Sequence, residues 1–376
     1  MTNLEMILAE PVIHALGWAL LHFVWQGALI ALFTVFILRL LRDYSAGLRY
    51  AAASTALLLM LIAPIFTAWR AAATMDAVTE PMRAVNEELF ASDNRTALTE
   101  PRAAASDASQ QTARPFLPRA EAAAGFPLAV HLNRLNARNV AVPWLAVAWL
   151  MCVLLLLARV GGGLLIANRL RRAKQLRPVA PEWCAALDRL ARHLDISRRV
   201  GVYQSTLVQV PTTIGWLRPV VLVPESAFAS LSAPQLEAIL AHELTHIRRH
   251  DYLINILQSL AEALLFYHPA VWWVAKQIRV EREHVCDDRA IAVTGSVATY
   301  ARALTEIELL CQRVAAGGGG GWRSPLALGA GGAPLLARIG RLIKPARNKG
   351  GNSLPGCSPR LWPSPPSARC WPARAA

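Results

Sequence analysis

Residues 241–246 are Ala-His-Glu-Leu-Thr-His, a pattern that combines two histidines with one acidic residue. On a helix, His242 and His246 are four residues apart, so both imidazoles leave the same face and can bind one Zn²⁺ ion. Glu243 follows the first histidine directly, where it can accept a proton from a water bound to that metal. A zinc ion lowers the pKa of such a water to about 7, so these residues predict a hydrolytic zinc site.

The residues before this motif predict the start of its helix and the elements that precede it. Ser232 is a good N-cap residue and Pro234 suits a first turn, so we expect the helix to begin at Ala233. The amphipathic periodicity of Pro181–His193 predicts another helix. Short apolar runs bounded by Pro and Gly predict strands at 200–203, 207–210 and 220–223. The sequence from 181 to about 314 is therefore expected to form a globular domain with helices and strands.

A catalytic zinc site needs a third protein ligand and one open position. Candidates for that ligand lie in residues 279–288, Arg-Val-Glu-Arg-Glu-His-Val-Cys-Asp-Asp. Glu283 and Asp287 are four residues apart and share a helix face, so one can bind the metal while the other accepts a hydrogen bond from a ligand histidine. His284 is the main rival for the third ligand. Cys286 as a ligand would give a softer site, closer to a structural zinc centre.

Long apolar runs predict that the chain crosses a membrane. Three runs have the required length, at 12–38, at 51–69 and at 140–157, the last of which continues past Arg159 to residue 167. Hydrophobic residues make up 54% of the chain and charged residues only 17%, and the mean hydropathy is +0.32. This composition argues against an ordinary soluble enzyme, and we expect three membrane-spanning helices.

Arginines near the ends of these runs predict the orientation of the chain. The short loop at 39–49 and the flank at 169–177 both carry several arginines, so both are expected in the cytoplasm. The N-terminus is then expected outside and everything after residue 173 inside, in the inner (cytoplasmic) membrane of the cell. The formal net charge is +14, with 39 Lys and Arg against 25 Asp and Glu. The basic residues are almost all arginine, and frequent use of Arg and Ala is explained by genome base composition, so we do not expect direct nucleic-acid binding.

Three further segments complete the expected organisation. Residues 71–139, rich in Ala, Ser, Thr and Arg, predict a low-complexity, largely disordered loop outside the membrane. Residues 252–278 are apolar but contain Glu262 and Pro269, so we expect two helices partly embedded in the membrane instead of a fourth span. Residues 315–376, rich in Gly, Pro and Arg, predict a disordered tail. The expected domain boundaries are therefore 1–70, 71–139, 140–167, 168–314 and 315–376.

These motifs together resemble the membrane metallopeptidases of the BlaR/MecR antirepressor family. Residues 242–251 are similar to that family's HExxH-xxx-HD helix, 266–269 (Phe-Tyr-His-Pro) to its F-x-HP turn, and 283–288 to its E-x-x-CD helix. Residues 211–215 and 219–224 resemble the strand region that precedes the zinc helix in this family. The pattern is also similar, more distantly, to the gluzincin ExxAD arrangement of CAAX-processing proteases.

The resemblance covers about 12–70 and 140–310 and implies both a fold and a site. The implied fold is an α-helical multi-span membrane protein with a cytoplasmic α+β gluzincin-type metallopeptidase domain. The implied site has zinc on His242, His246 and Glu283, Glu243 as the general base, and Asp287 as the carboxylate that orients a ligand histidine. Family sensors of β-lactams carry a penicillin-binding domain with a Ser-x-x-Lys motif. No lysine in this chain has a serine three residues before it, so we expect either a member without that sensor domain or a chain that has lost its C-terminal part.

These observations favour an integral-membrane zinc endopeptidase that acts in signal transduction. The expected partners are the lipid bilayer and a protein substrate, either a cytoplasmic regulator such as a transcriptional repressor or the protein itself; the oligomeric state is left open. One alternative is a quality-control or processing protease of the membrane. Another is a non-catalytic signalling protein with a structural zinc, which Glu243 disfavours because a structural site needs no base. A transporter would need internal repeats and more spans.

Overall fold

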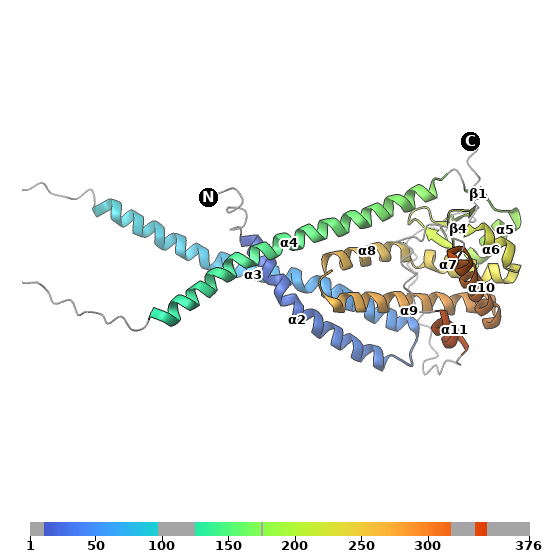
Figure 1. Ribbon diagram of the computed structural model, residues 1–376, viewed down its shortest axis with the longest axis horizontal. Coiled ribbons are helices and arrows are strands. Elements are labelled where there is room, and N and C mark those ends of the chain that lie inside the picture. The colour runs from blue at the N-terminus through green and yellow to red at the C-terminus, as the bar shows by residue number, and fades with distance from the viewer. Residues whose placement is uncertain (1–10, 97–124, 174–175, 317–334, 344–376) are drawn as a thin grey trace, which may run out of the picture. The chain divides into compact units, whose positions relative to one another are not determined.

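The computed structural model describes residues 11–96, 125–173, 176–316 and 335–343 (Figure 1). Within these residues the chain is mostly helical and contains one small sheet. The chain divides into two compact units. One consists of Met1–Val24 and Ile62–Met151, and the other of Trp25–Leu61 and Cys152–Ala376. All residues of the predicted zinc site belong to the second unit.

Three helices are long and apolar enough to cross a membrane, which agrees with the three runs predicted from the sequence. The apolar stretches are Ala15–Leu40 in α2 (Pro11–Leu40), Ala46–Ala71 in α3 (Ala46–Thr96) and Pro143–Arg171 in α4 (Gly125–Arg171). Many of their large apolar side chains are exposed, among them Leu32, Ile65 and Leu155. Exposed apolar surface of this extent is expected of helices that face lipid.

Two of these helices extend beyond the predicted spans. α3 continues to Thr96 and α4 begins at Gly125, so residues 71–96 and 125–139 differ from the disordered loop predicted for 71–139. The rest of that loop, 97–124, lies outside the described residues. The composition of 71–96 favours a helix, because this segment contains six alanines and three glutamates. These residues have high helix propensity and prolong a helix that has already formed, even without an apolar face.

The sheet has four strands in the order β1-β2-β4-β3. Their bounds are β1 Arg177–Pro178, β2 Gly201–Ser205, β3 Thr212–Ile214 and β4 Val220–Pro224. β2 and β4 are parallel, whereas β1 pairs with β2 and β3 pairs with β4 in antiparallel fashion. Helix α5 covers Pro181–His193, as the sequence predicts. Among the described strands, β3 forms one edge of the sheet.

The prediction of a strand at 207–210 is wrong, since the third strand lies at Thr212–Ile214 instead. The apolar character of 207–210 arises from burial in a loop. Val208 packs with Ile214 of β3 and Leu222 of β4 in a small hydrophobic cluster. The apolar run at 207–210 therefore indicates burial, and burial alone does not distinguish a strand from a loop.

Helix α7 lies at the centre of the second unit. The helices that follow the sheet are α6 Glu225–Ser230, α7 Ala233–Arg248, α8 Asp251–Leu264, α9 Pro269–Thr294, α10 Val297–Ala316 and α11 Leu335–Ile343. α7 packs against α5, α8, α9 and α10. Leu236, Leu240 and Leu244 recur every four residues along it and are buried in the main hydrophobic core with Val221 of β4. This apolar stripe leaves the adjacent faces of α7 for polar side chains.

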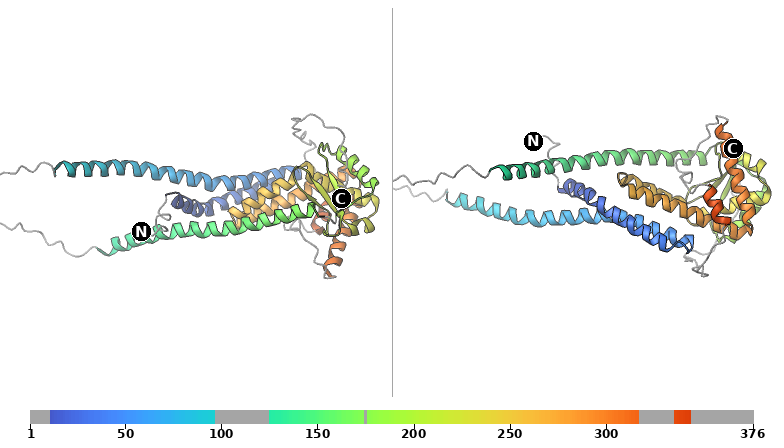
Figure 2. Two further views of the ribbon diagram at one scale, coloured as in Figure 1. Left: turned by 90° about the horizontal axis from the view of Figure 1, so that it is seen from above. Right: turned by 60° about the horizontal axis from the view of Figure 1, so that its bottom comes forward.

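The predicted start of α7 and the predicted break near Pro269 are both confirmed. The backbone N–H of Ser232 donates to Gln235 Oε1 at 2.9 Å, the reciprocal half of a capping box, and the helix begins at Ala233. α8 ends at Leu264 and α9 begins at Pro269, so residues 252–278 form two helices that lie side by side (Figure 2). The Nδ1 atom of His268 accepts a hydrogen bond from the N–H of Ala270 at 3.1 Å and caps α9.

The predicted disordered tail contains an ordered helix. α11 covers Leu335–Ile343, and its Leu335 and Leu342 side chains pack against the main core. The apolar residues at 335, 336, 339, 342 and 343 follow helical spacing, but the glycine-rich sequence before them conceals this pattern. The other residues of the tail after 316 lie outside the described residues.

Candidate metal centre

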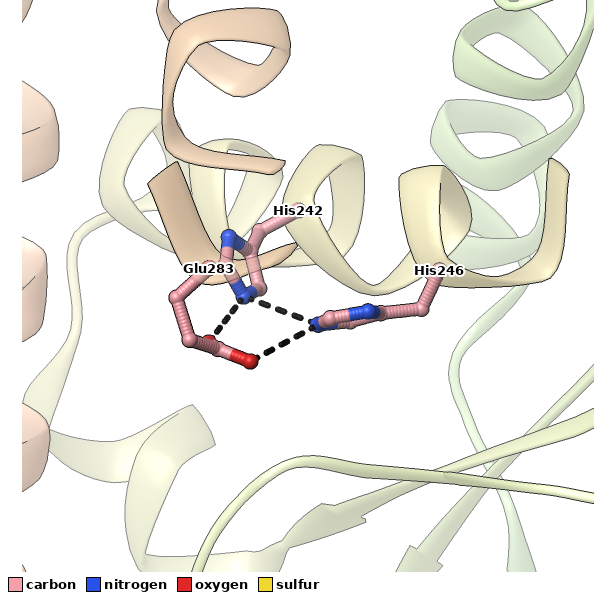
Figure 3. A group of neighbouring side chains, drawn as sticks. All are labelled: His242, His246 and Glu283. Atoms are coloured by element: carbon pink, nitrogen blue, oxygen red, sulfur yellow. Dashed lines mark hydrogen bonds and ion pairs between the residues drawn. The ribbon is translucent and has the colours of Figure 1, made fainter. Parts of the chain in front are cut away.

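His242 and His246 of α7 and Glu283 of α9 converge on one point (Figure 3). One ligand atom from each residue lies within 4.8 Å of the other two. The two Nε2 atoms are 3.2 Å apart, and Glu283 places Oε2 3.6 Å from His242 Nε2 and Oε1 4.0 Å from His246 Nε2. An ion bound tetrahedrally at about 2.0–2.1 Å from each nitrogen would separate them by roughly 3.3 Å. The spacing and the N, N, O donor set therefore fit Zn²⁺ well.

The opposite side of the His242 ring contacts a buried polar pair. Its Nδ1 atom lies 2.8 Å from Tyr300 Oη and 3.3 Å from Asp287 Oδ1, and the Tyr300 hydroxyl donates to Asp287 Oδ1 at 2.7 Å. Burial alone would lower the pKa of His242, but its hydrogen bonds with Asp287 and Glu283 raise it to about 9. In Asp287, burial opposes ionisation, yet His242 and Arg338 outweigh it and lower the carboxyl pKa. The pair thus fixes the ring with Nε2 directed toward the other two donors.

His246 is oriented in the same way by a different carboxylate. Its Nδ1 atom lies 2.8 Å from Asp251 Oδ2 at the start of α8, and Arg249 Nε donates to Asp251 Oδ1 at 3.4 Å. Burial would raise the pKa of Asp251, but the hydrogen bond with His246 and the charge of Arg249 lower it. The backbone of His250 is left-handed, with φ of 59°, and turns the chain so that Asp251 returns to His246. The sequence interpretation missed this contact.

Glu243 lies beside the three converging side chains without joining them. It is buried on α7, and its Oε2 atom accepts a hydrogen bond from Thr213 Oγ1 of β3 at 2.8 Å. The edge strand of the sheet therefore contacts the carboxylate that the sequence predicts as the base. Among the contacts that the structure describes for the five predicted site residues, only those of Glu243 reach the sheet.

The rival ligands have other partners. His284 Nδ1 lies 3.3 Å from Glu281 Oε2, on the same helix as Glu283. Cys286 Sγ lies 3.4 Å from His246 Nδ1, on the side of that ring which also contacts Asp251. Among the described residues, Cys286 belongs to a different set of possible metal ligands, which it forms with His246 and Asp251. Burial raises the pKa of the Cys286 thiol, so it is a poor source of thiolate.

Two residues that contact the site were not predicted. Tyr300 of α10 bridges His242 and Asp287, and Arg338 of α11 donates to both oxygens of Asp287. Arg338 Nη1 also lies 3.8 Å from Glu283 Oε2. Burial raises the pKa of Glu283, but its hydrogen bond with His242 and the charges of His246, His242 and Arg338 lower it overall. Only the helical spacing of 335–343 could have pointed to Arg338.

Two histidines on one buried helix, a carboxylate on a second helix and apolar helices of membrane-spanning length define the class of a membrane metallopeptidase. Residues 18–320 match the family described as BlaR1 peptidase M56, and the chain belongs to this family. The resemblance to the BlaR/MecR family predicted from the sequence is thereby confirmed.

Individual relatives match over shorter segments. The chain is 33% identical over 90 residues to the regulatory protein BlaR1 of Bacillus licheniformis, which covers 24% of this chain and 15% of that protein. It is 21% identical over 96 residues to the methicillin resistance mecR1 protein of Staphylococcus aureus (strain Mu50 / ATCC 700699), or 26% of this chain and 16% of that protein. The regulatory protein BlaR1 of Staphylococcus aureus is 24% identical over 101 residues, which cover 27% of this chain and 17% of that protein. The matched segments thus span less than a fifth of each relative.

Proposed function

We propose that the protein is an integral-membrane zinc endopeptidase of the antirepressor type, which hydrolyses peptide bonds in a cytoplasmic regulator or in itself during signal transduction. The observation that carries this proposal is the convergence of His242, His246 and Glu283 beside Glu243. Three protein ligands and an adjacent carboxylate base are the requirements of hydrolytic zinc sites. Membership of a peptidase family supports the same conclusion.

In this proposal His242 and His246 would hold the ion through Nε2 and Glu283 would hold it through its carboxylate. Asp287 with Tyr300, and Asp251, contact the opposite nitrogens of the two rings. Such contacts fix the ring orientation and the tautomer that a metal requires. The ligands would come from α7 and α9, which pack against each other. The spacing of the ligands is therefore set by the hydrophobic core.

When bound, Zn²⁺ would polarise the scissile carbonyl and make a water more acidic. Glu243 would accept the proton of the attacking water on its carboxylate and then transfer that proton to the nitrogen of the leaving amine. Thr213 Oγ1 donates to Oε2 of this carboxylate and restricts its rotation. The second carboxylate oxygen would remain available to exchange the proton.

The edge of the sheet offers a way to bind a substrate. Within the described residues β3 pairs with β4 alone, so its outer edge has backbone groups that can pair with an extended peptide. Thr213 belongs to β3 and contacts Glu243. A peptide paired with this edge would bring its backbone carbonyl groups close to the zinc ligands. Recognition through backbone groups suits an endopeptidase that acts on an extended segment.

We propose that the three spans lie in the inner (cytoplasmic) membrane. The N-terminus would then be outside the cell membrane and the peptidase domain in the cytoplasm. The cytoplasmic domain would begin near residue 168, and the contacts of α11 would extend it from 314 to 343. α8 and α9 would be partly embedded. A Cβ atom added at Gly27, inside α2, would lie 2.7 Å from His268 Nε2 between α8 and α9. Contact with the apolar part of α2 supports insertion of this helical hairpin into the bilayer.

The experiment is to measure metal content and cleavage by the purified protein in detergent, for wild type, Glu243→Ala and Glu283→Ala. Cleavage is followed as self-cleavage and on a candidate repressor and an unfolded control protein. We expect about one zinc per chain in the wild type. Glu243→Ala should keep the zinc and lose cleavage, whereas Glu283→Ala should lose both.

Other results would point to the alternatives. Zinc without cleavage in the wild type would favour a structural zinc in a signalling protein, and cleavage of any unfolded protein would favour quality control. Zinc retained in Glu283→Ala would place the third ligand elsewhere. Absence of zinc from the wild type would contradict the proposal.

A further inference from the structure

We propose that Arg338 of α11 is a positioning residue of the metal centre, which holds the Asp287 carboxylate in the orientation that fixes His242. This inference rests on the proposed zinc peptidase function. It assigns a role to a segment beyond the sequence motifs of the site, since α11 follows α10 after an intervening stretch of eighteen residues that lies outside the described part of the chain.

The guanidinium of Arg338 holds both oxygens of one carboxylate. Nε donates to Asp287 Oδ2 at 3.0 Å and Nη2 donates to Oδ1 at 2.5 Å. A planar fork of two parallel donors matches a carboxylate and fixes its plane, as a single point charge cannot. Nη2 also lies 3.3 Å from Tyr300 Oη. Arg338 therefore contacts both groups that meet His242 Nδ1.

Burial makes this pairing important for Asp287. The Asp287 side chain is 0% exposed and that of Arg338 is 15% exposed. A buried carboxylate without a cation takes up a proton or turns toward another positive charge. A bound metal ion would be such a charge, because Asp287 is one helical turn from Glu283 on α9. With both its oxygens bound by Arg338, Asp287 instead remains an acceptor for Tyr300 and His242.

The packing of α11 places Arg338 for this role. Leu335 and Leu342 lie against the main core, near the two ends of the helix. Arg341, one turn after Arg338, donates from Nη2 to the carbonyl of His284 at 2.8 Å and pairs with Asp288. Two arginines of α11 thus face the acidic residues of α9. Within the described residues Arg341 contacts neither Asp287 nor the side chains of the three proposed ligands, which makes it a matched control on the same helix.

A purely structural role for Arg338, as an anchor of α11, predicts different behaviour. An anchor would affect the unfolding temperature and leave the zinc affinity of the folded protein unchanged. A residue that acts through Asp287 should change zinc affinity, and this effect should depend on Asp287 being present.

The test measures zinc affinity by competition with a chelator for the full-length protein in detergent, for wild type, Arg338→Met, Arg338→Lys, Arg341→Met, Asp287→Asn and the double variant Arg338→Met/Asp287→Asn. We expect Arg338→Met to weaken zinc binding by about 10-fold or more, in the range that residues supporting metal ligands show. Arg338→Lys should restore part of this loss, since it keeps the charge without the fork. Arg341→Met should bind zinc like the wild type, and the double variant should be no weaker than Asp287→Asn alone.

Unchanged zinc affinity in a folded Arg338→Met protein would overturn the proposal. A double variant whose fold loss in zinc affinity equals the product of the two single-variant losses would also overturn it. If Arg338→Met does not fold, Arg338→Lys provides the same decision, because a wild-type affinity there would show that the bidentate fork is not needed. If the wild type itself binds no zinc, the proposed function fails instead, which is a separate outcome.

Discussion

Arg49, near the start of α3, donates from Nε to Glu281 Oε1 of α9 at 2.9 Å. The side chains are only 13% and 10% exposed. The Nη1 atom of Arg49 also donates to the carbonyls of Arg42 and Tyr44, so the arginine closes the loop between α2 and α3. Glu281 precedes the proposed ligand Glu283 by two residues. The connection between two apolar helices is therefore tied to the helix that bears a zinc ligand.

Breaking this ion pair should destabilise the protein. In Arg49→Gln, the largely buried Glu281 carboxylate would keep His284 as its one ion-pair partner within the described part of the chain. We expect a loss of about 1–3 kcal/mol in the free energy of unfolding, measured by denaturation in detergent. Arg189→Gln is the control, because its pair with Glu237 is 58% and 33% exposed and should contribute less than about 1 kcal/mol. Equal losses in the two variants would contradict the importance of the buried pair.

The contact between Gly27 and His268 leads to a second prediction. A Cβ at position 27 would lie 2.7 Å from His268 Nε2, so Gly27→Ala should force the ring away from its cap at the start of α9. We expect a loss of about 1–3 kcal/mol in stability, as for other overpacked sites. His268→Ser keeps a capping oxygen and removes the ring, so Gly27→Ala should have little effect in that background. If the losses of stability from Gly27→Ala and His268→Ser, measured by thermal unfolding, simply added in the double variant, the contact with His268 would not be the reason why residue 27 must be glycine.

The bond between His246 and Asp251 predicts a third effect. Asp251→Asn keeps the shape of the side chain but removes the charge that Nδ1 of His246 faces at 2.8 Å. We expect zinc affinity to fall by about 10-fold, because partners of ligand histidines commonly contribute this much. Chelator competition measures the change, with Asp195→Asn as a control at an exposed pair with Arg248. The same zinc affinity in Asp251→Asn and wild type would remove Asp251 from the support of the site.

Local sequence patterns were sufficient for part of this structure. The spacing of His242 and His246, the cap at Ser232 and the break before Pro269 depend on residues within a few positions, and the structure has each as predicted. β3 could not be placed in this way, because a buried loop and a strand have the same apolar composition. The helical ends of α3 and α4 beyond the spans depend on propensity, which a rule based on low apolar content ignores.

The support of the site depended on contacts that no local pattern specifies. Tyr300 reaches His242 across 58 positions and Arg338 reaches Asp287 across 51, so each contact arises only after α10 and α11 have packed. Asp251 is close to His246 in sequence, but it returns to the ring only because His250 adopts a left-handed conformation. Such a conformation is uncommon for a residue other than glycine and was not evident in advance.

The hydrogen bond from Thr213 Oγ1 to Glu243 Oε2, at 2.8 Å, leads to the last prediction. Thr213→Val keeps the β-branched shape in β3 and frees the Glu243 carboxylate to rotate. Since a hydrogen bond to a charged group contributes about 1.5 kcal/mol or more, we expect cleavage to slow by roughly 10-fold at equal zinc content. Thr212→Val is the control, because Thr212 donates to the Val210 carbonyl at 3.0 Å instead. If zinc content fell in parallel with cleavage, Thr213 would support metal binding, and if cleavage were unchanged, Glu243 would need no support from the sheet.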